Sequence, residues 1–238
     1  MTVFIRTVYD LKQEYVDNLH NGDVQVLIVK NALKEDIHKF GELEIQDLYL
    51  KKEVPIGHNI ESDHVMQEYE MRWHSDRAYG EPHPFVGLYC EESEKGASPT
   101  YFHDNITGWK MIPDDLKQKI KEEGPVLHSI KTYFERADYP HQFRSKAYER
   151  HFKMHAKNTH EMYRNDEFGE YLFFSEGYAN TKYLDEIKEN FYLDENVYAH
   201  EWSPGDLAVW NNYTVSHKRD HTPNEIKRTL YRYGLHAI

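Results

Sequence analysis

The sequence has a single cysteine, Cys90, and no long apolar run. One cysteine cannot form an internal disulfide or a thiolate metal site. No apolar stretch approaches the ~18 to 20 residues that a membrane-spanning helix needs. The N-terminal region carries Asp10 and Glu14, where a secretory signal would have an apolar core. These absences predict a cytoplasmic protein that does not insert into a membrane.

Basic residues are also in short supply, with 29 Lys and Arg against 41 Asp and Glu and a formal net charge of −12. Phosphate backbones and anionic membrane surfaces are bound by basic faces. We therefore expect neither a nucleic acid nor a membrane as partner. A small-molecule substrate is the expected ligand, and the composition leaves a homo-oligomer open.

The chain length and composition favour one domain over residues 1–238. A chain of 238 residues with 39% hydrophobic and 14% aromatic content can bury a full core. Short apolar, β-branched runs separated by Gly, Pro and Asn predict strands, and helical spacing predicts helices outside them. Many short strands with flanking helices fit a mainly β, α+β fold of the double-stranded β-helix type, the cupin-like jelly-roll barrel. The predicted strands are 24–29, 85–90, 100–103, 172–174, 197–202, 207–210 and 228–235, and the predicted helices are 33–43, 113–123 and 184–191.

Two segments have little hydrophobic periodicity. Residues 56–69 are polar and irregular and predict a loop. Residues 139–171 are dense in His, Tyr, Arg and Lys and are long for a connection in a compact domain. We interpret 139–171 as a lid-like insertion or partner surface, with a solvated excursion containing a short helix as the alternative.

The most informative stretch is Arg72-Trp73-His74-Ser75-Asp76. If it is extended, His74 and Asp76 leave the same face of the strand. A third ligand from a distant segment, His217, would complete a 2-His-1-carboxylate facial triad, which binds Fe(II) and leaves positions open for substrates. Zinc also accepts His and Asp ligands. The spacing of His74 and Asp76 alone is weak evidence, so the surrounding sequence decides the interpretation.

The C-terminal part resembles the taurine dioxygenase (TauD/TfdA-like) family of Fe(II)- and 2-oxoglutarate-dependent oxygenases. In that family a W-x-P-G-D-x-x-x-W-[DN]-N run precedes the second metal histidine, as residues 202–212 precede His217 here, and arginines follow eleven and fifteen residues later, as Arg228 and Arg232 do. The family's tryptophan before the first histidine matches Trp73, and its threonine some 25 residues on matches Thr100. The resemblance runs from about Trp73 to Leu235, and Asn211 stands where the family often has Asp.

By this resemblance, the iron ligands are His74, Asp76 and His217. The 2-oxoglutarate site maps onto Thr100 and Arg228, and O2 is the other co-substrate. An arginine suits a carboxylate buried in a barrel because its guanidinium offers two parallel hydrogen bonds. Arg228 and Arg232 share one face of an extended strand, so both are expected to point inward.

Three residues are candidates for binding the substrate. Arg232 would be a second inward cation, and an unpaired buried charge is costly. An anionic substrate such as an amino acid, carboxylate or sulfonate would balance it, and the alternative is a structural ion pair with an acidic residue. Of Tyr101 and Phe102, one is expected to face the barrel beside Thr100 and line the pocket, although strand packing also explains an aromatic pair there.

The resemblance implies oxidative decarboxylation of 2-oxoglutarate to succinate and CO2, with hydroxylation of the substrate as the default outcome. Desaturation, epoxidation and cyclisation are alternatives within the same cofactor chemistry. A zinc hydrolase is a second class, but it gives no reason for Thr100 and Arg228. A non-catalytic jelly-roll binding module is the third, and release of succinate separates all three.

Overall fold

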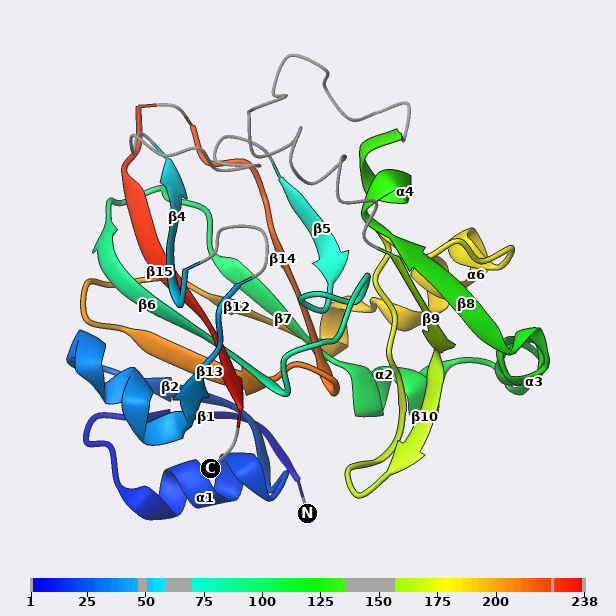
Figure 1. The fold of residues 1–238 in the computed structure, drawn as a ribbon, viewed down its shortest axis with the longest axis horizontal. Helices are drawn as coiled ribbons and strands as arrows, with labels where there is room; N and C mark the ends of the chain where they lie inside the picture. Colours follow the sequence, from blue (N-terminus) through cyan, green and yellow to red (C-terminus); the bar gives the residue numbers. More distant parts are fainter. Residues whose placement is uncertain (1, 47–50, 59–69, 136–156, 224, 237–238) are drawn as a thin grey trace.

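A computed structural model of the chain shows two facing β-sheets with helices around them, and it describes residues 2–46, 51–58, 70–135, 157–223 and 225–236 (Figure 1). The larger sheet has the strand order β1-β2-β13-β6-β15-β3, with β4 also paired to β15. Its strands are β1 (Val3–Val8), β2 (Val24–Val29), β3 (Glu42–Leu43), β4 (Glu53–His58), β6 (Phe85–Ser93), β13 (Leu207–Asn211) and β15 (Arg228–His236).

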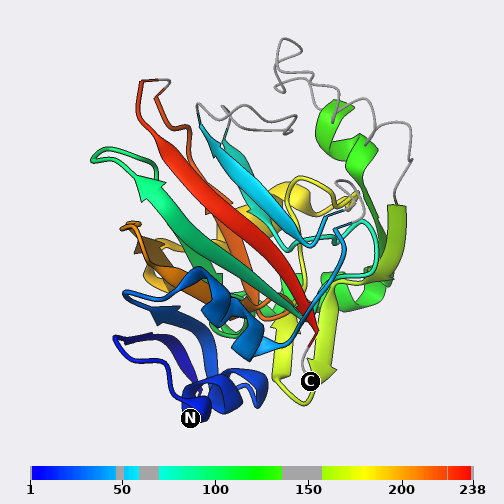
Figure 2. The ribbon, with the colours of Figure 1, turned by 60° about the vertical axis from the view of Figure 1, so that its left-hand side comes forward.

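The smaller sheet has the order β12-β7-β14-β5 and lies against one face of the larger sheet (Figure 1 and Figure 2). Its strands are β5 (Met71–His74), β7 (Thr100–Asp104), β12 (Val197–His200) and β14 (Val215–Arg219), and all neighbours in it are antiparallel. Successive side chains of a strand point to opposite faces of its sheet. Apolar side chains on the facing sides of the two sheets form the interior of the fold.

Buried side chains fill the space between the sheets. Phe102 of β7 packs edge-on against Trp210 of β13, with ring centroids 5.1 Å apart. Cys90 of β6 lies in the same cluster and is fully buried, and burial raises the pKa of its thiol to about 12. The remaining members of this cluster come from both sheets: Val26, Ile28, Val86, Leu88, Trp202, Ala208, Val215 and Leu230. This interior fixes the strands on which the candidate site residues lie.

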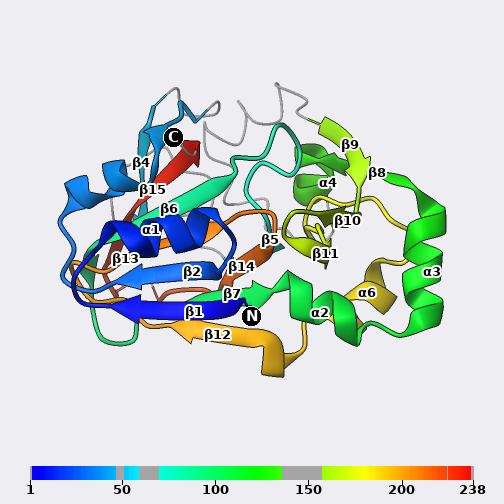
Figure 3. The same cartoon turned by 90° about the horizontal axis from the view of Figure 1, so that it is seen from below.

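The other face of the larger sheet is covered by α1 (Gln13–His20) and by the 3-10 helix η1 (Lys34–Phe40). Seen from below, α1 crosses over β1 and β2, which run parallel (Figure 3). Parallel neighbours need a crossover connection, and α1 supplies it. All six residues of β2 are buried because that strand has packed side chains on both faces.

A second region lies beside the sheets, where α2 packs against β11 and α6. Its apolar cluster includes Trp109, Leu116, Leu172 and Phe191. The elements of this region are α2 (Asn105–Met111), α3 (Asp114–Glu123), β8 (Pro125–Ser129), α4 (Ile130–Glu135), β9 (Lys157–Glu161), β10 (Tyr163–Asp166), β11 (Gly169–Leu172), α6 (Leu184–Phe191) and η3 (Asp194–Asn196).

The mainly β prediction is confirmed, and so are most of the predicted strands and the helices at 113–123 and 184–191. The helix predicted at 33–43 is instead the shorter η1 followed by β3. The loop predicted at 56–69 is wrong for residues 56–58, which belong to β4, and its remainder up to residue 69 lies outside the described residues. In the strand predicted at 172–174, only Leu172 is part of β11.

Residues 139–156 of the expected lid-like insertion lie outside the described residues. The described part, 157–171, is not an irregular excursion, because β9 pairs with β8 and β10 pairs with β11 along the full length of each ladder. Its role as a lid or partner surface stays a prediction. No helix within the described ranges is long and apolar enough to cross a membrane.

Candidate active site

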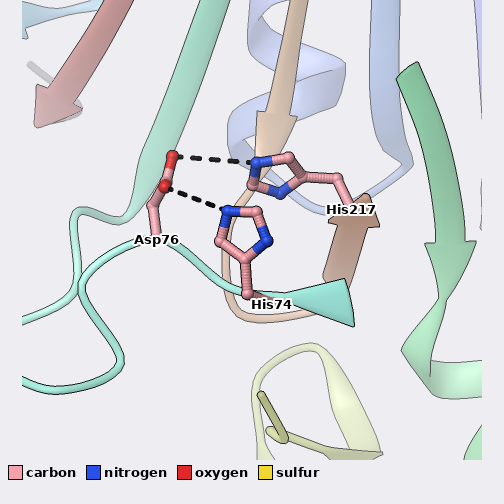
Figure 4. Close-up of side chains that lie close together, drawn as sticks. All are labelled: His74, Asp76 and His217. Atoms are coloured by element: carbon pink, nitrogen blue, oxygen red, sulfur yellow. Dashed lines mark ion pairs between the residues drawn. The ribbon is translucent and has the colours of Figure 1, made fainter. Parts of the chain in front are cut away.

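The first predicted ligand pair and His217 lie together in the structure. His74 ends β5, Asp76 lies in the following turn, and His217 is directly opposite His74 on the neighbouring strand β14 (Figure 4). Potential ligand atoms of the three residues all lie within 4.8 Å of one another. Because β5 ends at His74, the turn rather than strand parity brings Asp76 to the cluster, which corrects the expectation of a continuous strand through Asp76.

The two imidazoles are oriented toward the carboxylate. His74 Nε2 is 3.6 Å from Asp76 Oδ1, and His217 Nε2 is 4.0 Å from Asp76 Oδ2. His74 Nδ1 donates a hydrogen bond to the carbonyl of Arg72 at 2.7 Å, which leaves the lone pair on Nε2. That Nε2 is buried and has no hydrogen-bond partner among the described residues. The donor set and its orientation fit a divalent iron ion.

The protonation states also fit a metal centre. Burial, with help from the neighbouring His74, lowers the pKa of His217 well below its ordinary value, so the ring is neutral at pH 7. Burial alone would raise the pKa of Asp76, but Arg232 and the two histidines outweigh it and hold that pKa well below the usual range. Metal ligands must be neutral imidazoles and ionised carboxylates. The pKa shifts of His217 and Asp76 therefore favour the forms that bind a cation.

A second polar group lies around Arg228 on β15. Its side chain is 1% exposed, its Nε donates to the carbonyl of Ser98 at 2.9 Å, and its Nη2 donates to Thr100 Oγ1 at 3.1 Å. Nη1 is buried and has no hydrogen-bond partner in the described part of the chain. Burial, followed by the nearby Arg219, lowers the pKa of Arg228, which shows how poorly its charge is balanced.

Thr100 is held in a way that leaves its hydroxyl hydrogen available. Its Oγ1 accepts from Arg228 Nη2 and also from Trp202 Nε1, at 2.9 Å for the latter. A hydroxyl has one donor and two acceptor lone pairs. With both lone pairs used, Thr100 can add only a donated hydrogen bond, which suits a carboxylate ligand next to Arg228.

Arg232, four residues further along β15, has a different environment. Its Nε donates to Asp76 Oδ2 at 2.9 Å, and its Nη1 contacts the side-chain oxygen of Gln46. The expectation that Arg232 lacks a protein partner is therefore wrong. The structure contains the ion pair with an acidic residue that was the alternative, and that residue is one of the candidate iron ligands.

Tyr101 and Phe102 lie on opposite faces of β7. Phe102 is in register with His217, is fully buried and packs against Trp210. Tyr101 is in register with Lys218, whose Nζ lies 4.7 Å from the centre of its ring. Tyr101 thus lies on the face of the smaller sheet away from His217. One of the two was expected to face the interior beside Thr100, and that residue is Phe102. A role for Tyr101 in lining the substrate pocket is not supported by this orientation.

Some contacts at the site were not predicted from the sequence. Three polar residues contact the site segments from far away in the sequence: Ser98, Ser175 and Gln46. Each is 100 or more residues from its hydrogen-bond partner, so no local pattern indicates the contact. Trp202 and Asn212 belong to the recognised run, so their positions were visible. Their hydrogen bonds to Thr100 and Asp76 were not.

Comparisons with known proteins agree with this geometry. The family model described as Taurine catabolism dioxygenase TauD, TfdA family matches residues 29–233. Pentalenolactone F synthase from Streptomyces avermitilis is 25% identical over 177 residues, which cover 65% of this chain and 58% of that protein. The chain spans less than two thirds of the length of the curated relatives it matches.

Two solved structures show the same fold. The crystal structure of AAD-2 in complex with Mn(II) and N-oxalylglycine has a TM-score of 0.73 at 18% identity and covers 98% of this chain and 93% of its own. A taurine dioxygenase from Burkholderia xenovorans has a TM-score of 0.71 at 14% identity, with 99% and 88% covered. The jelly-roll prediction is confirmed, although the two sheets of the described residues do not close into one continuous ladder.

Because the family model matches most of the chain, this protein belongs to the TauD/TfdA family of non-haem dioxygenases, which use Fe(II), 2-oxoglutarate and O2.

Proposed function

We propose that this protein hydroxylates a small anionic molecule, such as an amino acid, a carboxylate or a sulfonate, while converting 2-oxoglutarate and O2 to succinate and CO2. One oxygen atom goes to the new hydroxyl group and the other to succinate. The observation that carries the proposal is the pairing of two buried features: a His-Asp-His cluster and an arginine whose Nη1 has no partner among the described residues.

His74, Asp76 and His217 are the proposed iron ligands. A bound ferrous ion would supply the O2 chemistry, and these three residues would hold it. The neutral ring of His217 and the ionised carboxylate of Asp76 favour the ion. The burial of His74, Asp76 and His217, at 3%, 8% and 8% exposed, limits water at the centre.

Arg228 and Thr100 are the proposed 2-oxoglutarate residues. A buried guanidinium without a carboxylate partner is costly, and the distal carboxylate of 2-oxoglutarate would balance it. Arg228 Nη1, which has no partner among the described residues, would donate one hydrogen bond to this carboxylate. The Thr100 hydroxyl would donate a second. The carbonyl of Ser98 and the indole of Trp202 keep both donors in place.

The anionic character of the substrate rests on Arg232. Its guanidinium lies against Asp76, so its positive charge is next to a proposed iron ligand and would attract an anion to the site. Arg232 is therefore proposed to have two roles: it keeps Asp76 ionised, and it attracts the anionic substrate. Phe102 lies on the same face of its sheet as His217 and would supply apolar contact to the substrate. Tyr101 lies on the opposite face.

Hydroxylation is the proposed outcome because it is the direct result of oxygen transfer to a C–H bond. Desaturation, epoxidation or cyclisation would use the same ligands and co-substrate. A zinc hydrolase explains the cluster but not the unbalanced Arg228. A non-catalytic module does not explain why two buried ring nitrogens face a carboxylate.

The first test is anaerobic addition of Fe(II) and then 2-oxoglutarate, followed by absorption spectroscopy. We expect a metal-to-ligand charge-transfer band that is absent from His217→Ala. Small acids, amino acids and sulfonates, each beside a neutral analogue, are then screened for a change in that band. With O2 admitted, succinate must appear in step with hydroxylated product. Absence of the band and of succinate in the native protein would overturn the proposal.

A further inference from the structure

We propose that Asn212 is a positioning residue that fixes the backbone of Asp76 and thereby sets the geometry of the iron site. This inference rests on the proposed role of Asp76 as an iron ligand. Asn212 follows β13 directly, is 0% exposed and lies 136 residues from Asp76 in the sequence. It touches no candidate ligand atom, so its action would be indirect.

The side-chain amide of Asn212 uses its hydrogen-bonding capacity on the turn that carries Asp76. Its Oδ1 accepts from the backbone N–H of Asp76 at 2.8 Å, and its Nδ2 donates to the carbonyls of Asp76 and His83, both at 2.9 Å. The N–H and C=O of Asp76 belong to the two peptide groups on either side of its Cα. Holding both groups fixes the direction in which the carboxylate leaves the backbone.

The turn needs such support because strand pairing ends before it. β5 stops at His74, so Asp76 has no ladder partner. The next residue, Arg77, has a φ of 59°, in the left-handed region that residues with a Cβ seldom adopt. Such a conformation persists only where surrounding contacts fix it. The hydrogen bonds of Asn212 lie immediately before this residue and are well placed to do so.

The other side of the same turn is held by Ser175. Its Oγ accepts from the backbone N–H of Ser75 at 2.9 Å, and the following residue, Glu176, donates its backbone N–H to the carbonyl of Trp73 at 3.0 Å. Asn212 and Ser175 thus act on the backbone of the ligand segment, whereas Arg232 acts on the carboxylate itself. Loss of the backbone support would let the carboxylate move while its charge stayed the same.

The neighbouring residue, Asn211, offers a matched control. It is also buried, at 1% exposed, and its Oδ1 accepts from the backbone N–H groups of Tyr213 and Thr214 at 2.9 and 3.2 Å. Asn211→Asp keeps an acceptor there. Asn212→Asp, of the same size and charge change, places an oxygen where Nδ2 now donates to two carbonyls. Comparing the two variants separates the loss of the Nδ2 hydrogen bonds of Asn212 from the effect of adding a buried acid.

The experiment measures binding of Fe(II) under anaerobic conditions, and of Co(II) with its visible spectrum, to the native protein, Asn212→Asp and Asn211→Asp. We expect Asn212→Asp to weaken the affinity for either metal about 10- to 100-fold, the range for residues that orient metal ligands, and to alter the Co(II) spectrum. Without metal, amide hydrogen exchange over residues 75–80 should be faster in Asn212→Asp than in Asn211→Asp.

A second variant covers the case in which Asn212→Asp does not fold. Ser175→Ala removes one acceptor from the same turn and should weaken metal binding several-fold with a smaller spectral change. If folded Asn212→Asp binds Co(II) with native affinity and spectrum, Asn212 has only a structural role and the inference is wrong. If Asn212→Asp does not fold, native Co(II) binding by Ser175→Ala would show that support of this backbone segment does not set the metal geometry, and the inference is wrong as well. If the native protein itself binds neither metal, the proposed function fails instead, and this inference falls with it.

Discussion

Two pairs of histidines are buried with their rings close together, one at the candidate iron site and one in the antiparallel pair of β8 and β9. The ring centroids of His74 and His217 are 4.1 Å apart, and those of His128 and His160 are 3.9 Å apart. Among the described residues, only the first pair forms a group with a carboxylate, Asp76, that could hold a metal ion.

The second pair is oriented toward backbone groups. His128 Nδ1 donates to the carbonyl of Val126 at 3.2 Å, and His160 Nε2 donates to the carbonyl of Ala78 at 3.1 Å. Burial lowers the pKa of both rings, that of His128 to about 3, so the pair is neutral at pH 7. Proximity of two imidazoles is therefore not the signature of a metal centre. The third, charged ligand and the direction of the free nitrogens distinguish the two pairs.

The sharpest way to break this comparison is to remove one histidine from each pair. His217→Ala should abolish Fe(II) binding and succinate release, because two ligands cannot hold the ion at a facial site. His128→Gln should bind Fe(II) as the native protein does. Metal content after anaerobic loading and gel filtration measures both. Retention of iron and of succinate release by His217→Ala would remove His217 from the ligand set.

The next largest effect is expected at Arg228, which has no carboxylate partner among the residues that the structure describes, in contrast to the ion-paired Arg232. Arg228→Gln loses a charge-assisted pair with 2-oxoglutarate, ~1.5 to 3 kcal/mol per such bond. We expect the apparent KM for 2-oxoglutarate to rise on the order of 10- to 100-fold while Fe(II) affinity stays near native. Titration of each ligand separately measures the two constants, and an unchanged KM would assign the distal carboxylate to another cation.

Arg232 should give a smaller effect on the metal and a distinct one on the substrate. Arg232→Gln removes the cation that lies 2.9 Å from Asp76 Oδ2, so the pKa of Asp76 should rise. We expect a loss of Fe(II) affinity on the order of 10-fold that worsens as the pH falls. Matched anionic and neutral substrates test the other half, because the variant should discriminate between them less well than the native protein. Equal discrimination would show that Arg232 serves Asp76 alone.

The change expected to leave iron binding unaffected concerns the second pair and the stability of the metal-free protein. The imidazole of His128 takes a proton below its ordinary pKa of 6.5 when unfolded but stays neutral to about pH 3 when folded. The unfolded state then binds more protons, so the free energy of unfolding falls as pH drops from 6.5 toward 3, by at most about 1.4 kcal/mol per pH unit.

His128→Gln should flatten this dependence, and His38→Gln, at an exposed histidine, should leave it as it is. Urea unfolding at several pH values between 4 and 7 measures the slope. A slope in His128→Gln equal to that of the native protein would place the acid sensitivity elsewhere.

The sequence predicted those parts of the structure that are encoded locally. The helix at 184–191 and the strand at 24–29 have the observed bounds, because apolar spacing and β-branched content are properties of the segment itself. The candidate iron and 2-oxoglutarate residues were visible because the spacing of a tryptophan-rich run, a histidine and two arginines is specific when taken together.

Other parts depend on contacts that no local pattern contains. β9 is entirely polar, Lys-Asn-Thr-His-Glu, and is a strand only because β8 pairs with it. Arg232 was expected to be unpaired because its partner lies 156 residues away. The same holds for Asn212, whose hydrogen bonds to Asp76 and His83 appear only when β13 is placed beside the turn.

The burial of Cys90 makes the single thiol a reporter of the whole fold. It is fully buried in β6, and a pKa raised to about 12 leaves almost no thiolate at neutral pH. Thiol reagents attack the thiolate, so modification should require opening of the sheet around β6. The rate at which a thiol reagent labels Cys90 would then follow global unfolding, and saturating Fe(II) and 2-oxoglutarate should slow it by the extent to which they stabilise the folded state.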